Sequence, residues 1–172
     1  DVSCTGFKIW FGSKNLSNAM IEEHKTVGLS GMRVLELGCG LGLVGIVIGK
    51  LIQLENLDLK VVEVKEVGVD KAEEATRSTR KVKELNSVVV LTDINAEALE
   101  LCGVNIQHNI VDSISNKNNK SNSNSRPFID TFELGFGNKI QEESLMNKFN
   151  NIPFDIIVAA DVIYEGTGWQ IN

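Results

Sequence analysis

Three short runs of apolar residues stand out along the chain, and each has the length and composition of a strand buried on both faces. They are Met32–Leu37, Val88–Leu91 and Phe154–Ala160. A weaker run at Phe128–Leu134 predicts a fourth strand. Strands of this kind occur in parallel sheets that are covered by helices on both faces. The runs therefore predict the interior of an α/β domain.

Helical spacing of apolar residues fills most of the intervals between these runs. The clearest predicted helices are Leu43–Leu54 and Ala96–Ile110, which follow the first two strands. Ile140–Phe149 predicts a further helix, and Gly6–Lys25 predicts a strand-like lead-in followed by a short helix. This alternation of strands and helices predicts a doubly wound, Rossmann-like parallel sheet with right-handed crossovers.

Two intervals do not fit the alternation. Residues 55–87 are irregular, with a candidate strand at Leu59–Val64 and a charged candidate helix at Lys71–Leu85. Residues 112–126 are nearly all Asn, Ser and Lys, and this composition cannot bury apolar surface. We therefore expect a single domain over residues 1–172 with two insertions, the second of them a disordered, low-complexity loop.

Composition narrows the class of protein. The net charge of −6 and the pI near 5.0 disfavour nucleic acid as a partner, because phosphate binding needs a basic face. Three cysteines without paired spacing predict a reducing compartment and no metal site. The apolar stretch Val34–Leu54 contains charged residues and five glycines, so we do not expect a membrane span. The expected location is the cytoplasm, with the nucleus as the alternative.

A glycine-rich turn follows the first predicted strand and precedes a helix. Glycines there can adopt positive φ and let a ligand approach the backbone at a helix N-terminus. Gly40, Gly42 and Gly45 fit the dinucleotide pattern G-x-G-x-x-G. Glu36 with Gly38, Gly40 and Gly42 fits the pattern E-x-G-x-G-x-G of methyltransferases. The pattern alone leaves both ligands open, together with a purely structural turn.

An acidic residue at the end of the next strand would bind the ribose hydroxyls of either nucleoside. Glu63 lies at the usual distance of about 20 residues from the turn. Asp93 lies further along the chain but ends a better strand and precedes a better helix. We favour Asp93, whose simplest alternative role is to cap the helix that begins near Ala96.

Four segments resemble the seven-strand, or class I, S-adenosylmethionine-dependent methyltransferases, and within them methyltransferase family 16, the protein-lysine methyltransferase group. The segments are Gly6–Trp10, Val34–Gly45, Val90–Asn95 (with Asn105 and Asn109 downstream) and Phe154–Tyr164. The last contains an Asp-x-x-Tyr signature, Asp161 to Tyr164, which narrows the resemblance to this family. The resemblance implies a class I methyltransferase fold that is truncated after the fourth strand, which would leave Val158 on an exposed sheet edge.

The resemblance also implies roles for particular residues. Glu36 and the turn of Gly38, Gly40 and Gly42 would hold the methionine part of S-adenosylmethionine, and Asp93 its ribose. Trp10 would border the pocket, although an ordinary core position is the alternative. Phe136 would lie against the adenine, but Gly135 stands where the family often has a carboxylate. Ala160 would contact the cofactor, and Asp161 and Tyr164 would face the methyl group and the substrate.

The expected activity is therefore methylation of a lysine side chain in a protein substrate. The amine must arrive uncharged, and a closed site lowers the pKa of a lysine by desolvation. Three alternatives stay open: a methyltransferase with another substrate, an NAD-binding Rossmann module and an inactive fragment. The sequence predicts neither the substrate protein nor the oligomeric state.

Overall fold

The computed structural model describes residues 6–66, 87–111 and 127–163. Within them the chain forms one parallel sheet in the order β3-β2-β1-β4. Its strands are β1 (Arg33–Leu37), β2 (Val88–Asp93), β3 (Phe128–Glu133) and β4 (Ile156–Ala159). Each lies within one or two residues of a predicted apolar run or inside it, so the predicted strands are confirmed.

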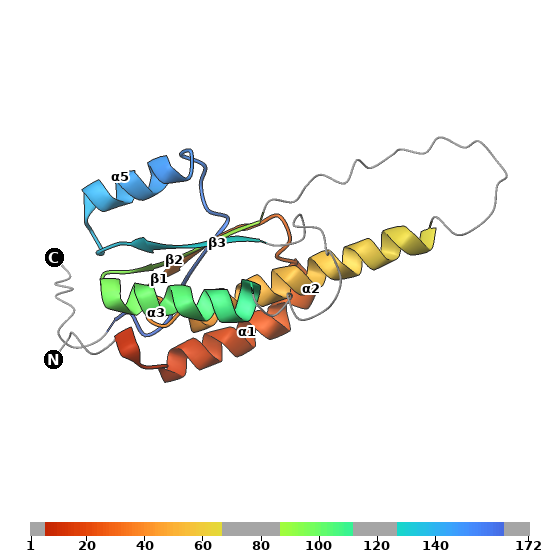
Figure 1. The fold of residues 1–172 in the computed structure, drawn as a ribbon, viewed down its shortest axis with the longest axis horizontal. Coiled ribbons are helices and arrows are strands. Elements are labelled where there is room, and N and C mark those ends of the chain that lie inside the picture. Colours follow the sequence, from red (N-terminus) through yellow and green to blue (C-terminus); the bar gives the residue numbers. More distant parts are fainter. Residues whose placement is uncertain (1–5, 67–86, 112–126, 164–172) are drawn as a thin grey trace.

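Helices cover both faces of this sheet (Figure 1). They are α1 (Phe11–Val27), α2 (Leu43–Glu66), α3 (Ala96–Ile106), which a short π-helix (Gln107–Val111) continues, and α5 (Lys139–Lys148). The first three helices lie on one face and α5 lies on the other (Figure 1). This arrangement confirms the predicted doubly wound, Rossmann-like α/β fold.

The core has two parts because side chains alternate between the faces of each strand. On the face of α1, α2 and α3, Val34 and Val89 pack with Ile48 of α2. On the opposite face, Leu35 and Val90 pack against Leu145 and Phe149 at the end of α5. Both faces of β1 and β2 are therefore buried, as their continuous apolar sequence predicts.

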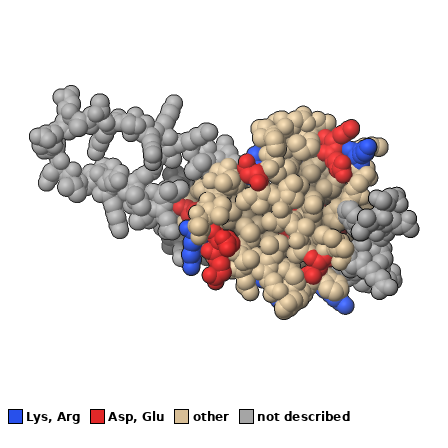
Figure 2. Space-filling view, turned by 180° about the vertical axis from the view of Figure 1, so that it is seen from behind, with Lys and Arg blue, Asp and Glu red and all other residues tan. Residues whose placement is uncertain are grey.

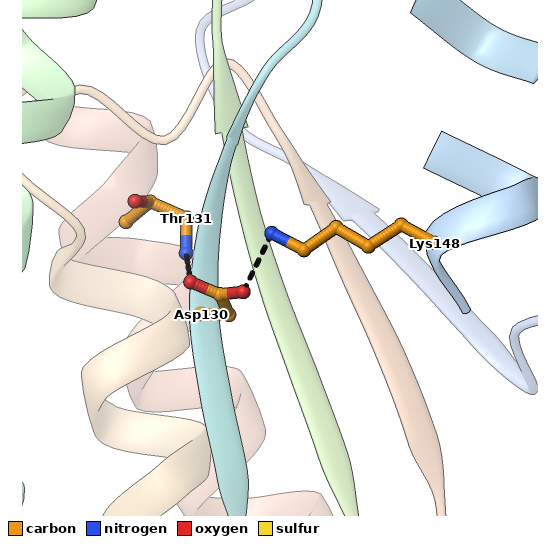
Figure 3. Close-up of polar contacts among 3 residues, drawn as sticks. All are labelled: Asp130, Thr131 and Lys148. Atoms are coloured by element: carbon orange, nitrogen blue, oxygen red, sulfur yellow. Dashed lines mark hydrogen bonds and ion pairs between the residues drawn. The ribbon is translucent and has the colours of Figure 1, made fainter. Parts of the chain in front are cut away.

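An ion pair attaches α5 to the outer strand β3 (Figure 3). Lys148 Nζ lies 2.8 Å from Asp130 Oδ2, while Asp130 Oδ1 accepts a hydrogen bond from the Thr131 N–H. The Lys148 ammonium also lies 5.5 Å from the ring centre of Phe132. Both members of the pair are partly exposed, so its contribution to stability is expected to be small.

Two predicted elements are wrong. Helix α2 continues to Glu66, so the segment Leu59–Val64 is helical and not a strand. The chain from 50 to 66 lacks Gly and Pro, and an established helix gains a hydrogen bond with each added residue, which outweighs the short apolar run. The predicted strand-like lead-in is also absent, because Gly6 and Phe7 form a 3₁₀ turn before α1. Helix α1 is longer than expected, at 17 residues.

Other predictions remain untested. The candidate helix Lys71–Leu85 and the low-complexity loop at 112–126 lie outside the described residues. β4 does occupy one edge of the described sheet. However, Val158 is only 8% exposed because its side chain points into the core beside α2, and its neighbour Ile157 is 61% exposed instead. Within the described residues Val158 thus lies on an edge strand, as expected, although its side chain is buried.

The order of the strands identifies the carboxyl ends of β1 and its neighbours as a candidate ligand site. From β1 the chain moves outward through β2 to β3, and α5 then returns it to the other side of β1. The direction of winding thus reverses between β1 and β4. Leu37 is paired with Thr92 and with Ala159, so these strands end at the same level. Open parallel sheets bind ligands outside the carboxyl ends of their strands at such a reversal.

Candidate active site at the carboxyl edge of the sheet

The glycine turn lies at this edge, directly after β1. Gly38, Gly40 and Gly42 have φ values of 65°, 51° and 83°, a region that side chains with a Cβ rarely adopt. The Gly42 N–H donates a hydrogen bond of 2.8 Å to the Cys39 carbonyl, which closes the turn. The three predicted glycines therefore have the backbone conformation for which glycine is needed.

The glycines divide into two groups by what a Cβ would meet. A Cβ on Gly42 would collide with Cys102 Sγ, and one on Gly45 would lie 2.6 Å from the Leu91 side chain. These two allow α2 and α3 to approach β2, so the structural interpretation holds for them. A Cβ on Gly38 would instead lie 2.7 Å from Val162, just beyond β4. Gly38 thus borders the point where the winding reverses.

Glu36 lies beneath the turn. Its side chain is buried, at 3% exposure, and its Oε2 accepts a hydrogen bond of 2.8 Å from the Gly45 N–H. Burial raises the pKa of Glu36 from 4.5 to about 8; the Gly45 hydrogen bond opposes this shift and the negative charge of Asp93 adds to it. Glu36 therefore joins the end of β1 to the first turn of α2 through a carboxyl group held in an apolar environment.

Asp93 ends β2 beside the turn. Its Oδ2 accepts a hydrogen bond of 2.8 Å from the Gly40 N–H, and its Oδ1 accepts one of 2.9 Å from the Asn95 N–H. The residue that caps α3 is Asn95, whose Oδ1 accepts from the Ala98 N–H. The capping role considered for Asp93 is therefore wrong. The Asp93 carboxylate instead connects the glycine turn to the start of α3.

Glu63, the alternative acidic residue, lies within α2 and not at a strand end. The strand that pairs with β1 on that side is β2, and it is Asp93 that ends it. Asp93 thus has the position that the ribose-binding pattern requires, and Glu63 does not.

Two aromatic side chains of the predicted site are half exposed. Phe136 is 41% exposed, and its Cζ lies 3.6 Å from the position of a Cβ on Gly38. Trp10, just before α1, is 46% exposed, so the core position considered for it is wrong. The Gly135 N–H donates to Gln141 Oε1, a contact that fixes the loop carrying Phe136.

Asp161 and Ala160 leave the sheet at the end of β4. Ala160 is half-buried, and Asp161 has a φ of 55°. The Asp161 carboxylate points to α1, where Oδ2 accepts a hydrogen bond of 3.2 Å from the Ser13 N–H. Asp161 therefore reaches the expected edge, but its side chain contacts a helix that no sequence pattern connects with it. Tyr164 lies outside the described residues.

Further contacts at the site could not be predicted from the sequence, although Asn105 is part of the family resemblance. Asn105 of α3 donates from Nδ2 to the Leu41 carbonyl and supports the turn from the side. The buried Cys39 thiol is hydrogen-bonded to Cys102, and this bond together with burial raises the pKa of Cys39, so the thiol is neutral. Only the fold brings these groups together, because they come from segments far apart in the sequence.

The surface offers no concentrated charge on the face shown in Figure 2, where acidic and basic side chains stand in small, separate groups on a mostly uncharged surface. Among the described residues no group of His, Cys, Asp and Glu side chains is arranged to hold a metal ion. In the same part of the chain, no helix is both long and apolar enough to cross a membrane.

A glycine turn at a strand-order reversal, with an acidic residue ending the neighbouring strand, defines a Rossmann-like fold of the kind that binds nucleosides. A family model described as lysine methyltransferase matches residues 2–86, which include α1, β1, the turn and α2. This match supports the assignment of the chain to methyltransferase family 16. No curated protein matches the chain. The family favours the methyltransferase interpretation of the glycine turn over the dinucleotide one, and it implies S-adenosylmethionine as cofactor.

Proposed function

We propose that this chain binds S-adenosylmethionine between the ends of β1, β2 and β4 and methylates a lysine side chain of a protein substrate. One observation carries the proposal: Asp93 ends the strand next to the glycine turn, with its carboxylate 2.8 Å from the Gly40 amide. A ribose-binding carboxylate beside a glycine turn is what a nucleoside cofactor requires at this edge.

The residues present fit such a cofactor. Asp93 is half-buried, and each carboxylate oxygen can accept a second hydrogen bond besides those from Gly40 and Asn95, which leaves capacity for two ribose hydroxyls. Gly38 and Gly40, which have no side chains, would let the methionine part approach their backbone. The half-exposed ring of Phe136 beside Gly38 offers an apolar surface to the adenine.

Other residues of the predicted site complete this assignment. We assign to Glu36 the support of the turn from below, since its buried carboxyl group is bonded to Gly45. Trp10 would border the bound cofactor, and Ala160 would contact it at the end of β4. When bound, S-adenosylmethionine would supply an electrophilic methyl group on a sulfonium.

The chain itself must then bring a neutral amine to that methyl group. Exclusion of water from the site lowers the pKa of a substrate lysine, because burial disfavours the ammonium. We assign Asp161 and Tyr164, after β4, to the side of the site that receives the amine, where a carboxylate or hydroxyl oxygen can orient the nitrogen. The position of Asp161 just after the end of β4 supports this assignment.

Cofactor binding is tested by thermal unfolding with S-adenosylhomocysteine or NAD, since a ligand that binds only the native state raises the unfolding temperature. We expect S-adenosylhomocysteine to stabilise the chain and NAD to have no effect. Asp93→Ala should abolish the shift. Asp130→Ala is the matched control: it removes a carboxylate from the adjacent strand β3, where Lys148 is its partner, and should leave the shift intact (Figure 3).

Stabilisation by NAD alone, or an unchanged shift in Asp93→Ala, would contradict the cofactor assignment. The substrate class is tested separately with labelled S-adenosylmethionine and a protein extract, followed by mass spectrometry of the labelled residue. We expect methyl-lysine; label on histidine, on N-terminal amines or on small molecules only would replace the lysine assignment. Methyl transfer that stays intact in both Asp161→Ala and Tyr164→Phe would remove these residues from the site.

A further inference from the structure

The first turn of α1 lacks a cap from its own sequence. The N-cap residue is Trp10, whose side chain makes no capping hydrogen bond, and the turn contains no acidic residue. The N–H groups of a first helical turn need acceptors from elsewhere. The Ser13 N–H finds one in Asp161 Oδ2 at 3.2 Å, from a residue 148 positions away. Asp161 therefore does for α1 what a local Ser, Asp or Asn usually does.

The contact between Asp161 and α1 is close enough to restrict both partners. A Cβ on Gly12 would lie 2.5 Å from Asp161 Oδ2 and 2.6 Å from Oδ1, so only glycine leaves room for the carboxylate. Asp161 itself has a φ of 55°, in the left-handed region that Asp and Asn tolerate better than most residues. A glycine inside the helix and an unusual backbone at Asp161 thus coincide at one contact.

The same N-terminal segment is also held at its other end. The Gly6 carbonyl lies 3.0 Å from the position of a Cβ on Gly40, and a Cβ on Gly6 would lie 3.0 Å from Ala98 Cβ. Residues 6–13, called here the Trp10 segment, therefore extend from the glycine turn to the end of β4. Within it, Ser13 Oγ donates to the Trp10 carbonyl at 2.7 Å. Trp10 lies between the two attachments.

We propose that Asp161 is a positioning residue: by accepting the Ser13 N–H it fixes the start of α1, and so keeps Trp10 at the border of the cofactor site. This inference rests on the proposed function, because it assigns the contact a role in cofactor binding. It gives Asp161 a role through α1 in addition to any contact with the substrate amine. Gly12 shares in this role, because its lack of a side chain leaves room for the Asp161 carboxylate.

Three substitutions in the full chain separate this role from others. Asp161→Ala removes the acceptor. Gly12→Ala keeps Asp161 but displaces its carboxylate from the Ser13 N–H. Asp161→Asn keeps an acceptor oxygen and a residue that tolerates positive φ, and it should rescue the contact. Gly103→Ala, in α3, is the matched control, because a Cβ there would meet nothing within 4 Å.

The measurements are the dissociation constant of S-adenosylhomocysteine by calorimetry and the hydrogen exchange of the Ser13 amide. The third measurement is the change in Trp10 fluorescence on binding. It is made in a chain whose other tryptophan is replaced by phenylalanine (Trp169→Phe). We expect Asp161→Ala and Gly12→Ala each to weaken binding roughly fivefold, as expected for a lost helix cap, with faster Ser13 exchange and a smaller Trp10 response. The double variant should bind no more weakly than either single one, because both act on one contact. Asp161→Asn and Gly103→Ala should bind as the unaltered chain does.

The outcomes distinguish this inference from the proposed function. An unaltered chain that binds no S-adenosylhomocysteine would overturn both. An unaltered chain that binds it, with unchanged affinity in Gly12→Ala and Asp161→Ala, would overturn the positioning role alone. Weaker binding in Asp161→Asn as well, with Ser13 exchange unchanged, would also overturn that role, since the carboxylate charge and not the cap would then matter.

Discussion

The glycine turn after β1 and the segment after β4 leave the sheet at the same edge but are held by different means. The turn is closed by contacts within ten residues, such as the Gly45 N–H to Glu36 and the Gly42 N–H to Cys39, and much of it is buried. More distant groups, the Asp93 carboxylate and the Asn105 amide, also bond to its backbone. Asp161 is exposed, and its carboxylate accepts a hydrogen bond from Ser13, which lies 148 positions away in the sequence.

This difference predicts how each half of the site responds to perturbation. A buried turn that is bonded both locally and to neighbouring elements opens only when a large part of the fold opens with it. An exposed segment held by a distant helix can separate when that helix moves. We therefore expect substitutions in the turn to change global stability, and substitutions after β4 to change ligand affinity with a smaller effect on stability.

The largest expected effect concerns the pH dependence of stability. The pKa of Glu36 is raised from 4.5 to about 8 in the folded chain, so the unfolded chain releases this proton at lower pH than the folded one. The contribution to stability is complete below pH 4.5 and is lost as the pH rises to about 8, a loss on the order of 5 kcal/mol. Urea denaturation of the unaltered chain and Glu36→Gln at several pH values measures it.

The glutamine variant imitates protonated Glu36 and keeps an oxygen acceptor for the Gly45 N–H. It should match the unaltered chain below pH 4.5 and exceed it in stability near pH 8. Parallel pH profiles of the two proteins would show that the Glu36 carboxyl group is not desolvated as the buried position requires.

The next effect compares two glycines with positive φ. Gly42→Ala should cost about 3 kcal/mol, from left-handed strain of about 1 kcal/mol and overpacking against Cys102 and Leu91 of about 2 kcal/mol. Gly137→Ala carries the same kind of strain without neighbours within 4 Å, so it should cost about 1 kcal/mol. Chemical denaturation measures both variants. An equal loss of stability in Gly42→Ala and Gly137→Ala would mean that the turn is not packed against α3 and β2.

The smallest effect concerns the amino end of β1. The Arg33 guanidinium donates to the carbonyls of Pro153, Phe149 and Ile152 and lies 5.4 Å from the ring centre of Phe154. Arg33→Lys cannot reproduce this planar set of contacts and should cost about 1–2 kcal/mol. Because Arg33 is at the edge of the sheet opposite the site, the affinity for S-adenosylhomocysteine should stay the same. Weaker binding of S-adenosylhomocysteine by Arg33→Lys would show that a change before the start of β4 alters the site at its carboxyl end.

Much of the fold is predictable from local pattern. Apolar runs, helical spacing and glycines predict the strands, the helices α3 and α5 and the glycine turn, because each of these patterns is complete within about a dozen residues. The prediction of a strand at Leu59–Val64 was wrong because the local pattern there does not distinguish a strand from a helix. The short apolar run is compatible with a strand or a helix, and the preceding helix α2, not the run, decided its structure.

The site shows the same division. The sequence by itself determined the glycine turn, its buried Glu36 and the two candidate acidic residues, because these depend on residue type and spacing along the chain. Only the tertiary structure decided that Asp93 ends the strand beside β1 while Glu63 lies in a helix. It alone also joined Asp161 to Ser13 of α1. A contact between residues 148 positions apart is set by the packing of whole elements, and no local pattern records it.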